Sequence, residues 1–341
     1  MAKRLMQKHL YKALQEHKDI VELYKREYSK DDKRDWRTYE QRVALRIKKA
    51  TQELEPIINE AYSMISQTKR RGRPENVPIT KKVMILLIKD IFQLSNRKMA
   101  NMLAMFTALT GIELSYKSVE RVYSNDLARM IIHNMFVLIT RRNGIKNADV
   151  SGDGTGYGLT VTKHYRNERC KELRKLNSGD ARKSGDKNTK NRKLFVYVFG
   201  LMDLGSGMYI GYGTSMNSEK EAFREAVGMA RGIGINISSA RLDKYYSSRS
   251  ITEEFDNDTS IYIIPKKNAT IRGSPKWKSI LRSYISDPIS HLHEYYRRNN
   301  SESGFSADKR TCGWKVWQKR YDRIDTALLC KGLWHNLLLM G

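Results

Sequence analysis

The sequence predicts an α/β protein, with a mixed sheet flanked by helices and a basic, all-α region before it. Apolar residues recur at three- and four-residue spacing up to about residue 145, which indicates helices. Beyond that point the spacing shifts toward two, which indicates strands. At 341 residues and 40% hydrophobic content, the chain is long and apolar enough for two or three domains with cores of their own.

Charge is the third observation. The chain carries 63 Lys and Arg against 37 Asp and Glu, a formal net charge of +26 at pH 7. The sequence has no apolar run of about 20 residues and no apolar stretch of a signal peptide, so we expect no membrane partner. We expect a cytoplasmic, nucleoid-associated protein, in which this charge predicts affinity for nucleic acid. On charge alone, a structural RNA-binding protein stays open.

The three cysteines do not indicate a metal or disulfide framework. Cys170, Cys312 and Cys330 are odd in number, lie far apart and show no zinc-ligand spacing. We therefore expect reduced, unpaired thiols.

Residues 1–77 are predicted to form a basic helical arm and a linker. Arg42, Arg46, Lys48 and Lys49 crowd one short part of the arm. This crowding is consistent with a solvated helix face and with an arm that tracks DNA, and the net charge favours the second interpretation.

The linker that ends this region is short and basic. Its Arg-Gly-Arg-Pro core contains Arg71 and Arg73 and resembles an AT-hook, whose extended arginines fit a narrow A·T minor groove. A plain basic linker is the alternative, and in both cases the two arginines are candidate DNA contacts.

Residues 78–145 are predicted to be helical and contain a candidate helix-turn-helix. Sequence signals for helix ends are N-caps at Thr80, Ser95 and Ser115 and a stop at Gly111. The helix after Ser115 bears Lys117, Ser118, Arg121 and Tyr123. Because the later helix of such a motif enters the major groove, Lys117 and Arg121 are candidate DNA contacts. The connection before this helix is longer than a tight turn, so a structural helical bundle stays open.

From residue 146 to residue 341 the chain alternates strands and helices. The first strand is followed by a basic, polar extension over residues 163–193. Two strands then flank a Gly-Ser-Gly turn, and a helix begins at Ser218, where Glu221 completes a capping box. The remaining elements are expected to be a strand over 237–248, a short helix over 250–258, a β-run over 259–269, helices over 275–298 and 291–310, and an amphipathic helix over 325–340.

This order of elements is that of an RNase H-like fold. Phosphoryl transfer on such a core needs carboxylates from separate elements that converge on two divalent cations. Asp153 in the first strand, Asp243 at a strand end and Glu302 on a late helix are candidates. Taken singly, each has a structural alternative. Asp153 could be a turn former, Asp243 a strand-end cap and Glu302 an exposed helical acid. Other acids of similar placement are Asp149, Asp203, Glu253 and Glu254.

One stretch combines an acid with cations. Tyr295, Arg298, Glu302 and Lys309 are spaced three, four and seven apart, which places them on one stripe of a helix at about 100° per residue. One acid between two cations and a phenol suits a phosphate backbone beside a metal ion. Gly304 is a poor helix former, and a helix break there would remove Lys309 from the stripe.

These residues resemble a known family. Asp153, Asp243 and Glu302, in that order on those elements, resemble the triad of DDE transposases. Residues 295, 298, 302 and 309 match the YREK signature of IS4-like insertion-sequence transposases at all four positions. The segment 264–268 resembles the strand that these enzymes place before the glutamate, and it contains Lys266 as a candidate DNA contact. The interval from Asp243 to Glu302 is too short for the large β-insertion of some relatives, which leaves the subgroup open.

The resemblance implies cut-and-paste chemistry on double-stranded DNA. The three acids would hold Mg²⁺ or Mn²⁺ in a two-metal site, water would attack at the inverted-repeat ends, and the freed 3′-hydroxyl would attack target DNA. Tyr295, Arg298 and Lys309 would hold phosphates. Family behaviour also implies a homodimer that pairs two DNA ends. The alternatives are an RNase H-like nuclease without strand transfer and a non-catalytic DNA-binding regulator or decayed transposase.

Overall fold

The computed structural model describes residues 5–28, 35–66, 76–160 and 195–340. Several sequence predictions lie outside these ranges, namely the linker with Arg71 and Arg73, the extension over 163–193, and Cys170. Cys312 and Cys330 are buried, and each is a free thiol, as expected.

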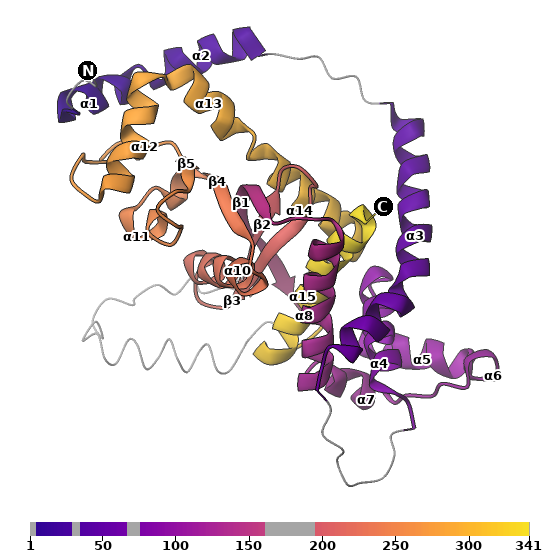
Figure 1. Ribbon diagram of the computed structural model, residues 1–341. Helices are drawn as coiled ribbons and strands as arrows, with labels where there is room; N and C mark the ends of the chain where they lie inside the picture. The colour runs from indigo at the N-terminus through magenta and orange to yellow at the C-terminus, as the bar shows by residue number, and fades with distance from the viewer. Residues whose placement is uncertain (1–4, 29–34, 67–75, 161–194, 341) are drawn as a thin grey trace, which may run out of the picture.

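The described strands form one mixed sheet (Figure 1). They are β1 (Asn147–Leu159), β2 (Phe195–Asp203), β3 (Tyr209–Ser215), β4 (Asn236–Leu242), β5 (Ser260–Tyr262) and β6 (Lys315–Val316). Their order is β3-β2-β1-β4-β5, and β6 pairs with the far end of β1. The pairs β3–β2 and β2–β1 are antiparallel, whereas β4 runs parallel to both β1 and β5. The α/β class and the mixed sheet agree with the sequence prediction.

Both faces of the sheet are covered by helices. Along β2, Val198 packs into the core that contains the last helix, while its neighbour Phe199 packs into the core beneath α10 (Glu219–Ile233). Side chains alternate along a strand, so a strand buried on both faces carries apolar residues at successive positions. Helix α10 lies very close to β3, because a Cβ at Gly213 would be 2.0 Å from the carbonyl oxygen of Ala222.

Local signals located most helix ends correctly. The hydroxyls of Ser95, Ser115 and Ser218 each accept a hydrogen bond from the backbone amide three residues later, at 3.2 Å. Gly111 ends a helix with a φ of 64°. The predicted cap at Thr80 is wrong, because α4 begins one residue earlier and Pro78 precedes it with its carbonyl accepting the first helical bond.

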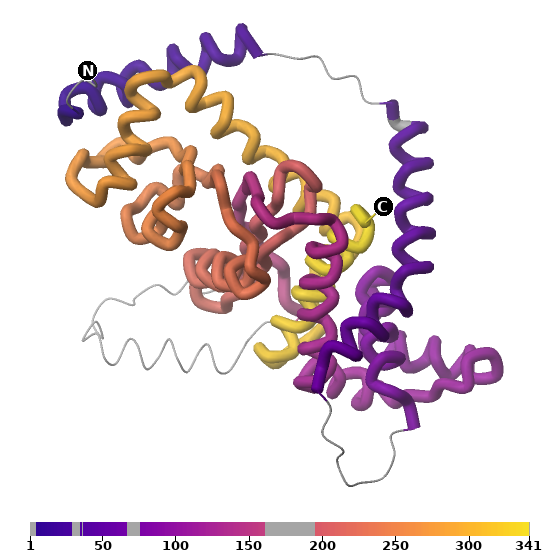
Figure 2. The backbone as a smooth tube through the Cα atoms, in the orientation of Figure 1, coloured from indigo at the N-terminus to yellow at the C-terminus, as the bar shows by residue number. Residues whose placement is uncertain are grey.

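The region before the sheet is helical, as predicted. Its helices are α1 (Gln7–Gln15), α2 (His17–Tyr28), α3 (Trp36–Ser63), α4 (Ile79–Ile91), α5 (Asn96–Met105), α6 (Thr107–Thr110), α7 (Tyr116–Val122) and α8 (Asp126–Arg142). The predicted arm does not pack as one piece. Helices α1 and α2 lie on α12 (Pro275–Ser286) and α13 (Pro288–Tyr296), whereas α3 packs on α4, α8 and α15 (Tyr321–Leu339) (Figure 2).

The elements after β4 are short until the chain end. They are η1 (Lys244–Tyr246), α11 (Arg249–Thr252), α12 (Pro275–Ser286), α13 (Pro288–Tyr296), α14 (Asn299–Cys312) and α15 (Tyr321–Leu339). The segment 264–268 follows β5 instead of forming the strand itself, and Pro265 within it has no amide hydrogen to donate to a ladder.

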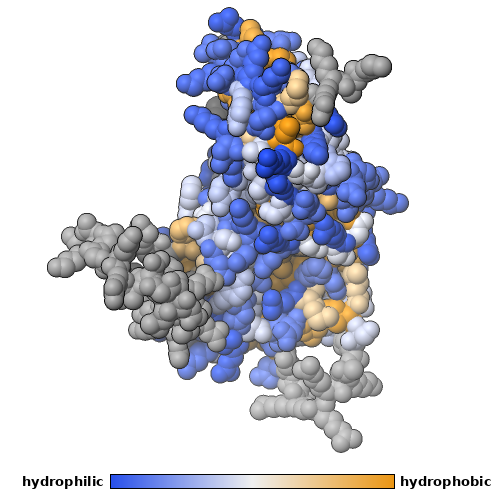
Figure 3. Space-filling model, turned by 90° about the vertical axis from the view of Figure 1, so that its left-hand side faces the viewer, coloured by the Kyte–Doolittle hydropathy of each residue, from blue (hydrophilic) through white to orange (hydrophobic). Residues whose placement is uncertain are grey.

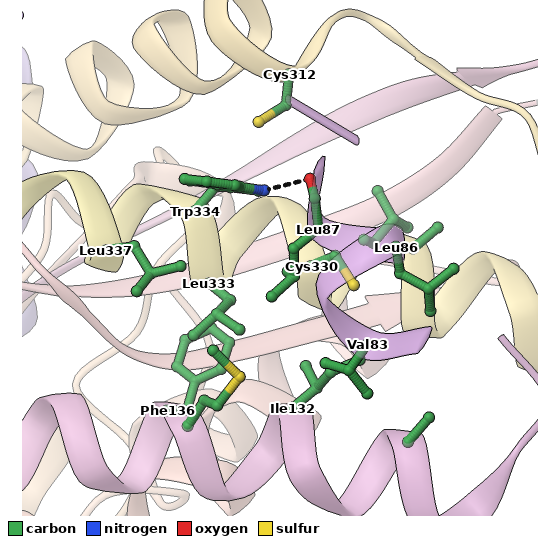
Figure 4. Close-up of a cluster of buried hydrophobic side chains, with 14 of the residues drawn as sticks. Val83, Leu86, Leu87, Ile132, Phe136, Cys312, Cys330, Leu333, Trp334 and Leu337 are labelled. Atoms are coloured by element: carbon green, nitrogen blue, oxygen red, sulfur yellow. Dashed lines mark hydrogen bonds between the residues drawn. The ribbon is translucent and has the colours of Figure 1, made fainter. Parts of the chain in front are cut away.

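Helix α15 is buried on nearly all sides, so the prediction of an amphipathic terminal helix is wrong. Leu333 and Leu337 are fully buried, and the indole of Trp334 donates a 2.8 Å hydrogen bond to the carbonyl of Leu87 in α4 (Figure 4). Helices α4 and α8 cover one side of α15, and β3 and α14 cover the other. The hydrophobic core therefore runs without a break across the predicted domain boundary at residue 145.

The outer surface is largely polar. On the face shown in Figure 3, hydrophilic residues predominate and apolar patches are small. Within the described ranges, no helix has both the length and the apolar composition that a bilayer crossing requires.

Candidate active site

Asp153 and Asp243 lie side by side at the centre of the sheet. Asp153 is in β1, and the last residue of β4, Leu242, pairs in parallel register with Gly152. Asp243 directly follows β4, so this pairing brings the two acids to the same place on neighbouring strands. One carboxylate oxygen of Asp243 accepts a 2.7 Å bond from the amide of Tyr245, which leaves the other oxygen facing the site.

Arg298 joins two of the three acids. Its guanidinium lies 2.7 Å from Oε1 of Glu302 and 3.6 Å from Oδ2 of Asp243. Glu302 is in the first turn of α14, and Arg298 immediately precedes that helix. The three predicted acids therefore come from three separate elements: Arg298 contacts Asp243 and Glu302, and the charges of all three side chains act on Asp153.

The prediction that all four residues lie on one helix is wrong, because the helix breaks between Tyr296 and Asn299 and leaves Tyr295 on α13. No break occurs at Gly304, so Glu302 and Lys309 stay together on α14. Gly304 serves close packing, because a Cβ there would be 2.3 Å from the methyl group of Met202. A side chain at this position would require the buried end of Met202 to move.

The junction before α14 is tied to the sheet. The hydroxyl of Ser151 in β1 donates a 2.9 Å hydrogen bond to the carbonyl of Arg298, and the hydroxyl of Ser301 donates a 2.8 Å hydrogen bond to the same oxygen. The ring of Tyr295 lies under the guanidinium, 5.4 Å from its carbon, and is only 4% exposed. Tyr295 therefore supports Arg298 from the core. The guanidinium Nε is buried and has no hydrogen-bond partner among the described residues, which leaves one donor unused.

The electrostatics of Asp153 reflect the crowding of acids. The pKa of its carboxyl is raised to about 6, chiefly by burial and to a smaller extent by Glu302 and Asp243, against the opposing effects of the Gly154 amide and Arg298. Burial lowers the pKa of Lys309, although the charges of Asp153 and Asp308 oppose this shift. The ammonium of Lys309 donates a 2.5 Å hydrogen bond to the hydroxyl of Thr155, two residues along β1 from Asp153.

The acids fit a divalent cation in kind. Carboxylate oxygens are the donors that Mg²⁺ and Mn²⁺ prefer, and the raised pKa of Asp153 marks a half-buried place with an excess of negative charge. Within the described part of the chain, no three acidic, histidine or cysteine side chains are close enough together to hold one ion. The guanidinium of Arg298 lies between Asp243 and Glu302 instead.

A comparison with curated proteins decides the family. The chain is 43% identical over 291 residues to a protein of Archaeoglobus fulgidus described as the probable transposase for insertion sequence element ISA1214. The matched region covers 85% of this chain and 84% of that protein. The chain belongs to the insertion-sequence transposases. This confirms the family expected from the sequence, while no protein-family model and no solved structure matches.

The other acids of the transposase that compete for the same role have structural partners. Asp149 accepts bonds from the hydroxyls of Ser238 and Ser239, at 2.9 and 2.6 Å. Asp203 accepts a 2.8 Å bond from the amide of Ser206 in the turn between β2 and β3. Glu254 pairs with Arg224 at 3.0 Å, whereas Glu253 is an exposed residue at the C-cap of α11.

The candidate DNA contacts of the transposase fall into two groups. Lys266 lies beside the acids, because its ammonium donates a 3.0 Å hydrogen bond to the carbonyl of Tyr245, two residues after Asp243. Lys117 and Arg121 are exposed on α7, which packs mainly on α4 and α5 and not on the sheet.

Tyr123, on the same predicted recognition segment, is not a surface residue. It is fully buried. Its hydroxyl accepts a 2.9 Å hydrogen bond from Lys89 and donates a 3.2 Å hydrogen bond to Asp90. Its position next to exposed cations in the sequence gave no sign of this burial.

Sequence reasoning missed Glu219, in the first turn of α10. A Cβ at Gly154 would lie 2.1 Å from Oε1 of Glu219, so the glycine next to Asp153 leaves room for this carboxylate. The hydroxyl of Tyr246 donates to the same oxygen. Burial raises the pKa of Tyr246, and Glu219 and Asp153 both add to the shift, which places the two acids within electrostatic reach of one phenol. The SGDGTG motif was the available signal, since glycines around an acid permit close approach.

Proposed function

We propose that this transposase is a DDE-type enzyme that cleaves the inverted-repeat ends of its insertion sequence and joins the 3′-hydroxyl ends to target DNA. The observation that carries the proposal is that Arg298 bridges Asp243 and Glu302 while all three charges act on the carboxyl of Asp153. These acids are far apart in the sequence and come from two strands and a helix, which is what convergence on a shared phosphate requires.

The sheet supports an RNase H-like core for this chemistry. Three antiparallel strands, β3, β2 and β1, are followed by the parallel strands β4 and β5, with helices on both faces. In such a sheet the ends of neighbouring parallel strands bring their side chains together, as β1 and β4 do for Asp153 and Asp243.

The three carboxylates are the proposed ligands of Mg²⁺ or Mn²⁺. Divalent ions bound there would activate an attacking hydroxyl and stabilise the leaving oxygen. Binding requires that Arg298 release at least one of its two carboxylate partners, since its guanidinium now lies between them.

Arg298 and Lys309 are the proposed phosphate contacts. The planar guanidinium of Arg298, which already contacts two carboxylates, suits two phosphate oxygens at once. The ammonium of Lys309, within electrostatic reach of Asp153, supplies a point charge on the other side of that acid. Tyr295, buried beneath Arg298, holds the guanidinium in place for this contact. A homodimer that pairs two DNA ends completes the proposal.

The substitution Glu302→Gln in the full chain tests the assignment. It removes a charged ligand without changing shape, so we expect cleavage of duplex DNA bearing the element ends to fall about a hundredfold or more. Binding of the same DNA should change little, because phosphate contacts dominate affinity. Gel assays of cleavage, of strand joining and of binding measure the three effects.

Glu253→Gln is the matched control, since Glu253 is an exposed acid at the C-cap of α11. Cleavage that survives Glu302→Gln would overturn the metal-site assignment. Cleavage by the unsubstituted chain without any joining would favour a nuclease over a transposase of this type.

A further inference from the structure

A groove opens from the candidate site along helix α14. It has a volume of about 660 Å³ and runs between α3 and α14. Arg42 and Arg46 line it on the α3 side, and Glu302, Ser303, Ser306 and Arg310 line it on the α14 side. The candidate catalytic acid thus forms part of the groove wall.

The charge of the groove is strongly positive. Its three arginines are exposed, and Glu302 is the one acid among its lining residues. Arg42 and Arg46 are four residues apart and so lie on the same face of α3. Within the described ranges, neither guanidinium forms an ion pair, so both are available to an anionic ligand.

The wall formed by α3 stands clear of the core. Its buried residues begin at Ala50, and the preceding part up to residue 49 carries exposed side chains at most positions. Figures 1 and 2 show this part of α3 running past α14 and the chain end. Packing of the core therefore does not explain why arginines face α14 here.

Lining chemistry selects the ligand. Guanidinium groups and serine hydroxyls are donors that bind phosphate oxygens. A groove of this kind that ends at a carboxylate used for phosphodiester cleavage suits a DNA backbone better than an acidic peptide, since a continuous strand must lead to the scissile bond.

We propose that the groove between α3 and α14 binds the phosphate backbone of the DNA strand next to the scissile bond, with Arg42, Arg46 and Arg310 as its contacts. This inference rests on the proposed function. It assigns α3 to the cleavage site itself and separates that role from recognition of the repeat sequence by other parts of the chain.

Salt dependence of binding tests the inference. Each phosphate contact contributes about 0.9 to the slope of log affinity against log salt, so Arg42→Ala and Arg46→Ala should each lower the slope by about 0.9 and together by about 1.8. At moderate salt, the affinity of the double variant for element-end duplex should fall about tenfold or more. Cleavage at limiting DNA should fall in parallel.

Arg37→Ala is the control on the same helix. Arg37 is exposed but lies about 180° around the helix from Arg46 and does not line the groove. Its slope should match that of the unsubstituted chain. The pair Arg42→Lys and Arg46→Lys keeps both charges and should restore the slope, which separates lost contacts from lost folding.

The outcomes distinguish the inference from the proposed function. Equal slopes for the double alanine variant and Arg37→Ala, in a chain that binds and cleaves, would overturn the groove and leave the function standing. Loss of slope confined to the double variant in a chain that binds but does not cleave would support the groove and overturn the function. Equal loss with Arg37→Ala would indicate a general basic arm and also overturn the groove.

Discussion

Arg298 balances charge at the candidate site. Two carboxylates flank its guanidinium, and the ring of Tyr295 lies beneath it. Burial lowers the pKa of Arg298, but Tyr295, Glu302 and Asp243 raise it by more, so the side chain stays a fixed cation. A cation at this point is what the surrounding acids attract, and in the proposed enzyme a metal ion would share that attraction.

Asp153 should reduce the stability of the protein at neutral pH. Its folded pKa of about 6 exceeds the usual value, so the protonated carboxyl contributes stability that is full below about pH 4 and is lost as pH rises through about 6. Asp153→Asn removes the buried charge. At about pH 7.5 it should stabilise the fold by about 1–2 kcal/mol, after allowance for partial exposure.

Thermal unfolding without divalent ions checks this prediction. The advantage of Asp153→Asn should shrink as the pH is lowered toward about 4, where the carboxyl of the unsubstituted chain is protonated. A variant that is less stable than the unsubstituted chain at neutral pH would show that burial does not penalise this carboxylate. Asp149→Asn is a control on the same strand, because the hydroxyls of Ser238 and Ser239 already stabilise that charge.

Helix α14 carries Glu302 and Lys309, and a buried polar network holds it in place. The hydroxyl of Tyr209 in β3 donates a 2.8 Å hydrogen bond to Asp308. Nδ1 of His335 in α15 lies 2.7 Å from the other carboxylate oxygen of that acid. The second ring nitrogen of His335 lies 2.8 Å from the carbonyl of Gly207. Both ring nitrogens therefore face acceptors, which favours the doubly protonated ring.

This network should make stability depend on pH. Burial lowers the pKa of His335, but Asp308 and the Gly207 carbonyl outweigh burial and raise it, while Arg46 in α3 opposes them. The stability from protonated His335 is full below about pH 6.5 and is lost as pH rises through the raised folded value. His335→Gln should therefore lower the melting temperature most at acidic pH and remove this part of the pH profile.

Melting curves across the pH range test the network. Asp308→Asn should abolish the same pH step from the other side of the pair, because the imidazolium loses its counter-charge. His133→Gln is a control, since burial alone lowers the pKa of His133 in α8. An unchanged pH profile in both network variants would contradict a charged His335.

One hydrophobic core around α15 joins the sheet to the helices before residue 145. Leu333 is fully buried where α15 meets the helices before residue 145, and Figure 4 shows it facing Phe136 of α8. Leu333→Ala should destabilise the protein by about 2–5 kcal/mol through lost burial and a residual cavity. Because one core joins the sheet to the earlier helices, unfolding should remain a single transition that moves to lower temperature.

Calorimetry distinguishes this from two independent units. Leu109→Ala is the matched control, because Leu109 is 82% exposed on α6 and should leave the transition unchanged. A second transition that ignores Leu333→Ala would show that the helices before residue 145 fold separately. The division of the chain into functional segments 1–77, 78–145 and 146–341 stays a prediction, and this experiment does not test it.

Local features could be predicted because their physics is local. The caps at Ser95, Ser115 and Ser218 need only a hydroxyl three residues before an amide, and the spacing of Arg298, Glu302 and Lys309 is written in the chain. The order of strands and helices followed from apolar periodicity. The family followed from four spaced residues and two earlier acids, and a relative confirmed it.

Long-range packing determined the rest. The burial of α15, the insertion of Arg298 between Asp243 and Glu302, and the approach of Glu219 to Gly154 join residues that are distant along the chain. Apolar periodicity shows which face of a helix is hydrophobic, but not how many neighbouring elements cover that helix. The sequence therefore predicts an amphipathic helix where the fold encloses α15. An acid shows its type in the sequence, whereas its charge balance depends on what the folded chain brings beside it.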